Sequence, residues 1–67
     1  MAITLKAARI NKGYKRPEVI SLLAEKGVKI TVNTLASYES QRTQPDIVVA
    51  KALAGIYEMS VDDIIFL

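Results

Sequence analysis

The fold is decided by residues 13–45, which read GYKRPEVISLLAEKGVKITVNTLASYESQRTQP. This stretch has the pattern of two short amphipathic helices with one turn between them. Pro17 suits the first turn of the first helix, because the missing N–H of proline costs nothing there, and Gly27 supplies its end. Thr31 can cap the second helix, which we expect to run to about Ser40.

The second helix of this pair has one face to bury and one to present. Leu35 and Tyr38 lie three residues apart, so they share the face that packs on the core. Small or polar side chains occupy the other positions, and we expect four of them to face outward: Val32, Asn33, Ala36 and Ser37. A helix of this kind, following a helix and a turn, is typical of a segment that enters a DNA groove.

Helical spacing predicts one more helix before this pair and one more after it. Thr4 can cap a first helix that runs to about Lys12, and Gly13 supplies its left-handed stop. Pro45 and Asp46 open a fourth helix. The side chains expected to turn inward from these two helices are Leu5, Ala8, Ile10, Ile47, Ala50, Leu53, Ala54 and Tyr57.

The last residues predict a short fifth helix, which makes the expected fold class all-α. Ser60 and Asp63 have the spacing of a capping box, and Ile64 and Ile65 would follow on that helix. Between the second and third helices, Val28 and Ile30 alternate with Lys29. We interpret that segment as an extended turn, because a lone strand would have no partner.

Length and composition limit the class of protein. Sixty-seven residues are enough for one domain, 1–67, with a core only marginally large enough to fold alone. The chain has no cysteine, so no disulfide or thiolate metal site is available, and a reducing cytoplasm fits best. No apolar run approaches the roughly 20 residues of a spanning helix, and the first residues do not resemble a signal peptide, so we expect no membrane partner.

The net charge of +2 hides an uneven distribution of charge along the chain. Residues 1–45 carry eight basic against three acidic side chains, which is a net +5, and residues 46–67 carry a net −3. This asymmetry suits one basic face for a polyanion and an opposite end kept away from it. Solvated charge on the surface of a small helical protein is the alternative interpretation.

The order and spacing of several motifs resemble the Cro and lambda-repressor type of helix-turn-helix domain, the Xre-like family, over essentially the whole chain. The markers are Arg9, the Gly13-Tyr14-Lys15-Arg16 entry to the second helix, Thr34-Leu35 with Tyr38-Glu39, Pro45, and residues 60–64. The resemblance implies a compact five-helix DNA-binding domain whose third helix, at about 32–40, reads the major groove.

By position, the resemblance implies that Val32, Asn33, Ala36 and Ser37 contact base edges. The amide of Asn33 can pair with adenine N6 and N7, and Val32 can offer an apolar contact, for example to a thymine methyl. The resemblance also implies that Arg16, which stands where the family usually has glutamine, grips a phosphate. The other phosphate contacts that it implies are Lys15, Lys29, Thr34, Ser40, Gln41, Arg42 and Thr43.

Arg9 and Glu39 resemble a structural ion pair of the family that joins the first helix to the end of the third. The chain departs from the family pattern in three places. About five residues are added between Val19 and Thr31, which lengthens the second helix and the turn. Lys15 replaces a small capping residue, and Gln41 takes a place often held by glycine after the third helix.

Enzyme and metal functions find little support. The chain has no histidine or cysteine and no glycine-rich phosphate loop, and the adjacent carboxylates Asp62 and Asp63 fit a helix start better than a catalytic pair. We therefore expect no catalytic residues, no metal site and no cofactor. The function expected is sequence-specific binding of a double-stranded DNA operator by a transcriptional regulator, a phage or mobile-element repressor that acts as a homodimer.

The alternative function is that of a protein-interaction module, antitoxin-like or an adaptor. The apolar end of the chain, Ile64, Ile65, Phe66 and Leu67, is more apolar than a solvated terminus requires, which suggests a dimer or partner surface. If Ile64 and Ile65 instead finish the core, this surface is lost. The two functions differ in salt dependence, because affinity for DNA falls steeply with salt.

Overall fold

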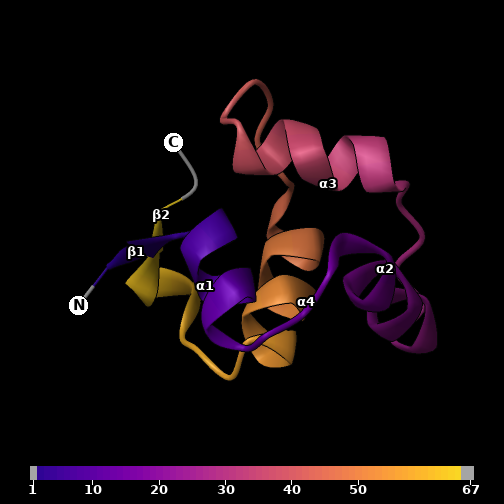
Figure 1. Ribbon diagram of the computed structural model, residues 1–67, viewed down its shortest axis with the longest axis horizontal. Coiled ribbons are helices and arrows are strands. Elements are labelled where there is room, and N and C mark those ends of the chain that lie inside the picture. Colours follow the sequence, from indigo (N-terminus) through magenta and orange to yellow (C-terminus); the bar gives the residue numbers. More distant parts are fainter. Residues whose placement is uncertain (1, 66–67) are drawn as a thin grey trace.

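Four α-helices account for most of the chain in the computed structural model, which describes residues 2–65. A 3₁₀ turn and two very short strands complete the fold (Figure 1). In chain order the elements are β1 (Ile3–Thr4), α1 (Leu5–Asn11), α2 (Arg16–Glu25), α3 (Val32–Glu39), α4 (Ile47–Ile56), η1 (Val61–Asp63) and β2 (Ile64–Ile65). The prediction of a mostly helical fold is confirmed, but the prediction of five helices is wrong.

The fifth helix is replaced by a 3₁₀ turn and a strand. Ser60 caps η1 as predicted, with its hydroxyl accepting a hydrogen bond from the Asp62 amide at 3.3 Å. The chain then becomes extended, and β2 pairs in parallel with β1, with Ile3 opposite Ile64. β-Branched isoleucines favour this extended geometry. The strand forms because β1, which contains Ile3, lies beside it and pairs with its backbone.

Ile64 is 6% exposed and belongs to the core. It is therefore not available as part of a dimer or partner surface. The side chain of Ile65 and the whole of Phe66 and Leu67, which were predicted to share that surface, lie outside the described residues.

One hydrophobic core joins the helices. Figure 1 shows α4 between α1 and α2, with α3 lying across one edge of the molecule. The side chains that are most completely buried come from three of these helices and from the residue after α4: Val19, Leu23, Leu35, Leu53 and Tyr57. Val28 and Ile30 pack against the core from an extended segment, as predicted, and so cover the junction of α2 and α3.

Two apolar side chains predicted to be buried are exposed. Ile10 is 55% exposed because Leu5, Ala8 and Arg9 form the inward face of α1, and Ile10 lies off that face. Ile47 is 60% exposed because it is the first residue of α4, one turn before the buried Ala50.

Local capping explains where three of the helices begin. The side chains of Thr4, Thr31 and Asp46 each accept a hydrogen bond from the backbone N–H three residues later, at 3.1, 3.1 and 2.9 Å. The start of α2 is held differently, because the ammonium of Lys15 cannot accept a hydrogen bond. There, the carboxylate of Glu18 accepts from the Lys15 N–H at 2.8 Å.

All four α-helices end in the same way, with a residue in the left-handed conformation followed by a hydrogen bond back into the last turn. Gly13 and Gly27 occupy this position after α1 and α2. Gln41 (φ 64°) and Glu58 (φ 56°) occupy it after α3 and α4. The resemblance to the family indicates that Gln41 takes a place often held by glycine, which fits its left-handed conformation. No feature of the sequence indicates the same conformation at Glu58.

Candidate nucleic-acid interface

α3 is held to the molecule by one side of the helix and presents the other. The side chain of Leu35 points from α3 into the core and is fully buried. Thr31 caps the start of the helix, where the Thr31 and Thr34 hydroxyls also lie 3.0 Å apart. Asn33 and Val32 are exposed in its first turn, whereas Ala36 and Ser37 are half-buried one turn later. The four residues predicted to face outward therefore do so to different degrees.

An open hollow of about 410 Å³ runs beside this face. It is lined by the first residue of α2, by α3 and by the segment that follows α3: Arg16, Asn33, Ala36, Ser37, Ser40 and Arg42. Three of these residues were predicted to contact bases and three to contact phosphates. We call this site the α3 hollow.

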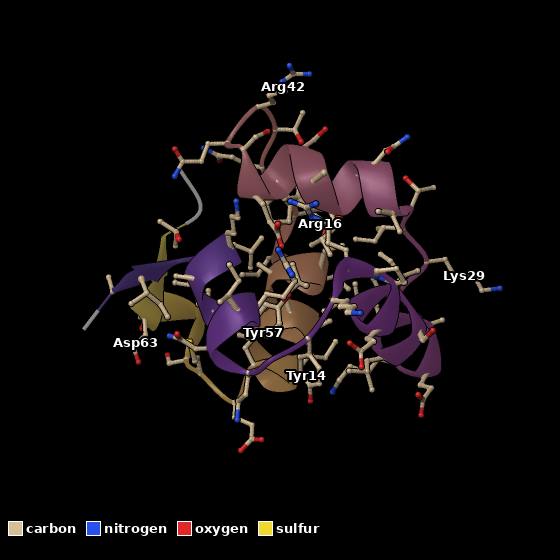
Figure 2. The ribbon with its side chains drawn as sticks, in the orientation of Figure 1. Tyr14, Arg16, Lys29, Arg42, Tyr57 and Asp63 are labelled. Atoms are coloured by element: carbon tan, nitrogen blue, oxygen red, sulfur yellow. The ribbon has the colours of Figure 1, made fainter. Side chains whose placement is uncertain are left out.

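The end of α3 carries Arg42 to the rim of the hollow. Gln41 adopts the left-handed conformation, and the next residue, Arg42, donates its N–H to the Ser37 carbonyl at 3.0 Å. Figure 2 shows the Arg42 side chain projecting outward from the loop after α3. A guanidinium in this place can bind an anion that lies along the hollow.

Arg16 reaches the hollow from α2, and its guanidinium is already engaged. Its Nε donates to Glu39 Oε1 at 2.9 Å, and its side chain is 36% exposed. Arg9 binds the same carboxylate, from Nε to Oε2 at 2.7 Å and from Nη2 to Oε1 at 3.3 Å. The side chain of Glu39 is 1% exposed, so two arginines share one buried carboxylate.

The cluster of Arg9, Arg16 and Glu39 continues toward the core. Arg9 Nη1 donates to the Tyr14 carbonyl at 2.9 Å, which ties α1 to the segment before α2. The hydrogen bond to Glu39 raises the pKa of Arg9, so that guanidinium keeps its charge although it is buried. Burial also raises the pKa of the neighbouring Tyr57, whose Oη has no hydrogen-bond partner among residues 2–65.

Several residues predicted to contact DNA do not line the hollow. These are Val32, Lys15, Lys29, Thr34, Gln41 and Thr43. Figure 2 shows Lys29 projecting away from Arg16, from the segment between α2 and α3. The Thr34 hydroxyl lies in the cap of α3, beside that of Thr31, and Gln41 shapes the turn through its backbone.

Sequence reasoning missed the bond between Arg16 and Glu39. Arg16 was interpreted only as a phosphate contact, and Glu39 only as the partner of Arg9. No local spacing rule links two residues that are 23 positions apart.

The described part of the chain contains neither the residues of a metal site nor a helix that could span a membrane. Residues 2–65 contain no group of three or more histidine, cysteine, aspartate or glutamate side chains placed to hold a metal ion. In the same range, no helix combines the length and the apolar character that crossing a membrane demands.

Comparison with known families identifies the class of protein that this geometry defines. A family model described as helix-turn-helix matches residues 5–64, which is nearly the whole chain. The chain therefore belongs to the Cro and lambda-repressor type of helix-turn-helix family, whose members bind specific DNA sequences as transcription regulators. No curated protein and no solved structure gave a match.

Proposed function

We propose that this chain is a non-enzymatic transcriptional repressor of the phage or mobile-element type that reads its operator with α3. One observation carries the proposal. The α3 hollow brings the predicted base-reading residues Asn33, Ala36 and Ser37 into one concave surface between Arg16 and Arg42. Small and polar side chains between two guanidiniums suit a DNA strand, because its phosphates flank the base edges of a groove.

Base reading is assigned to the outward side of α3. The exposed amide of Asn33 can donate to adenine N7 and accept from adenine N6 as a bidentate pair. Val32 lies next to it at the start of the helix and offers an apolar contact to a thymine methyl. Ala36 and Ser37 lie one turn further along α3, where their small side chains let the helix approach the bases closely.

Phosphate binding is assigned to the cationic side chains of the hollow. Arg16 and Arg42 are its cationic residues, and Ser40 adds a hydroxyl to the same lining. Lys15, Lys29, Thr34, Gln41 and Thr43 are proposed as peripheral contacts, on the turns that would lie along the backbone. Such contacts fix the register of the protein on the duplex and carry no sequence information themselves.

Repression would follow from occupancy, with no cofactor and no chemical step. A dimer bound over a promoter excludes polymerase, and two copies of α3 would enter successive major grooves about 34–36 Å apart on a two-fold site. A dimer is proposed because one small module contacts too few base pairs for useful specificity. Such a repressor acts in the cytoplasm of a bacterial cell or of a phage-infected host, where its operator lies.

Selection of bound duplexes from a random pool tests this proposal. We expect a two-fold symmetric sequence, bound at least about 10³-fold more tightly than a scrambled duplex. Asn33→Ala should relax the preference at one base pair, whereas Arg16→Ala should weaken binding to all duplexes alike. Equal losses on specific and scrambled DNA for Asn33→Ala would contradict the assignment of that residue.

A further inference from the structure

Glu39 is bound more extensively than a simple ion pair requires. Its carboxylate accepts three hydrogen bonds from two guanidiniums, at 2.7, 3.3 and 2.9 Å, and it is almost completely buried. Arg9 alone neutralises the carboxylate and binds both of its oxygens. Arg16 therefore adds a positive charge that the folded core does not need for balance.

The two arginines differ in what they face. The side chain of Arg9 is 10% exposed and is also fixed to the Tyr14 carbonyl, so it belongs to the interior. The side chain of Arg16 is 36% exposed and lines the α3 hollow. The cluster of one carboxylate and two guanidiniums carries a net charge of about +1, and the part of it that solvent and ligands can reach is Arg16.

The bond to Glu39 leaves most of the Arg16 guanidinium available. Arg16 uses only its Nε in this bond, and within residues 2–65 its two Nη groups have no hydrogen-bond partner. Guanidinium is planar, so an Nε fixed on one side also fixes the direction of both Nη groups. These are the groups that bind a phosphate in a bidentate manner.

We propose that Glu39 is a positioning residue for DNA binding, which orients Arg16 so that its two Nη groups meet a backbone phosphate at the edge of the α3 hollow. This inference rests on the proposed function and deepens it. Glu39 lies at the end of α3, so the same carboxylate fixes the phosphate-binding guanidinium relative to the helix that reads the bases. The phosphate contact and the base contacts are thereby held in one register.

A simple electrostatic view predicts the opposite effect of losing this carboxylate. Glu39→Gln removes one negative charge and raises the formal net charge from +2 to +3, which by itself should tighten binding to DNA. The positioning role predicts weaker binding, because Arg16 must then be ordered when the phosphate binds. Ordering one long side chain corresponds to about a three- to tenfold loss of affinity.

The test is a double-mutant cycle on the affinity for a duplex DNA, measured by fluorescence anisotropy with the selected operator. We expect Glu39→Gln to weaken binding about three- to tenfold and to cause no further loss of affinity once Arg16 is alanine. Its effect should add to that of Arg42→Ala, the matched control, since no bond joins Arg42 to Glu39. Glu39→Gln binding as tightly as the wild type, or losing equally in both backgrounds, would overturn the inference.

A second variant keeps the test decisive if Glu39→Gln does not fold, which circular dichroism establishes first. Arg16→Lys keeps the charge, but its single ammonium cannot present the planar fork that binds Glu39 and a phosphate through different nitrogens. We expect Arg16→Lys to lose about as much affinity as Arg16→Ala, and wild-type affinity in Arg16→Lys would overturn the inference. Wild-type protein that fails to prefer its selected duplex would instead refute the proposed function, and this inference with it.

Discussion

Replacing Arg9 with alanine removes three hydrogen bonds and leaves a buried carboxylate with half of its partners. Arg9 donates two bonds to Glu39 and one to the Tyr14 carbonyl. Removing one partner of a buried ion pair costs about 3–5 kcal/mol, because the other charge remains desolvated. Arg16 still donates one charged hydrogen bond to Glu39, which offsets part of this cost. We therefore expect Arg9→Ala to lower the free energy of unfolding by about 2–3 kcal/mol.

This loss is large for a chain of 67 residues, whose total stability is of the order of 3–10 kcal/mol. It corresponds to a fall in Tm of roughly 10–20 °C. Arg16→Ala is the matched control, because it removes the other guanidinium from the same carboxylate. Its side chain is partly exposed, so solvent can replace it, and we expect a loss of no more than about 1 kcal/mol.

Urea denaturation followed by far-ultraviolet circular dichroism measures both variants on one scale. We expect Arg9 to contribute mainly to folding and Arg16 mainly to DNA binding. Equal losses of stability for the two variants, or a loss below about 1 kcal/mol for Arg9→Ala, would show that burial does not separate their roles.

The remaining predictions concern helix ends and the buried hydroxyl, all measured by the same denaturation. Gln41→Gly should stabilise the fold by about 0.5–1 kcal/mol, because glycine adopts the left-handed conformation freely, and an unchanged or lower stability would contradict that reading of the turn. Gly27→Ala should destabilise it by about 1–2 kcal/mol through its φ of 82° alone, since an added Cβ meets nothing within 4 Å. Tyr57→Phe should leave stability at pH 7 unchanged or raise it by up to about 1 kcal/mol, because it removes a buried hydroxyl that has no partner among residues 2–65, and a clear loss would reveal one. Burial raises the pKa of Tyr57, so above the ordinary tyrosine value of 10.0 the unfolded chain loses a proton that the folded chain keeps. Wild-type stability should then fall by up to about 1.4 kcal/mol per pH unit as the pH rises beyond 10, more steeply than that of Tyr57→Phe.

Features that depend on local sequence were predictable. The caps Thr4, Thr31 and Asp46 act on amides three residues away, so a short window of sequence contains the whole interaction. The pattern of α3 was equally local, because Leu35 and Tyr38, three residues apart, mark the side of the helix that packs on the core. The resemblance to the helix-turn-helix family named four outward residues of α3, of which Asn33, Ala36 and Ser37 line the hollow and Val32 does not.

Features that depend on distant partners were not predictable in this way. Ile64 forms a strand because Ile3, 61 residues earlier, lies beside it in the folded chain. The bond between Arg16 and Glu39 likewise depends on how α2 and α3 pack, and the longer connection between them left that angle open. Ile47 is apolar and has helical spacing, yet the spacing does not reveal that the buried face of α4 begins only one turn later, at Ala50.

The central claim is that the α3 hollow is the surface that meets DNA, and amide chemical shifts test it most directly. Isotope-labelled protein would be titrated with its selected duplex and compared with a titration by a scrambled duplex. The claim predicts that the largest changes fall on residues 32–42 and on Arg16, and that those of Asn33 and Ser37 differ between the two duplexes. Changes centred on α4 or on the β1–β2 pair, with α3 unaffected, would contradict it.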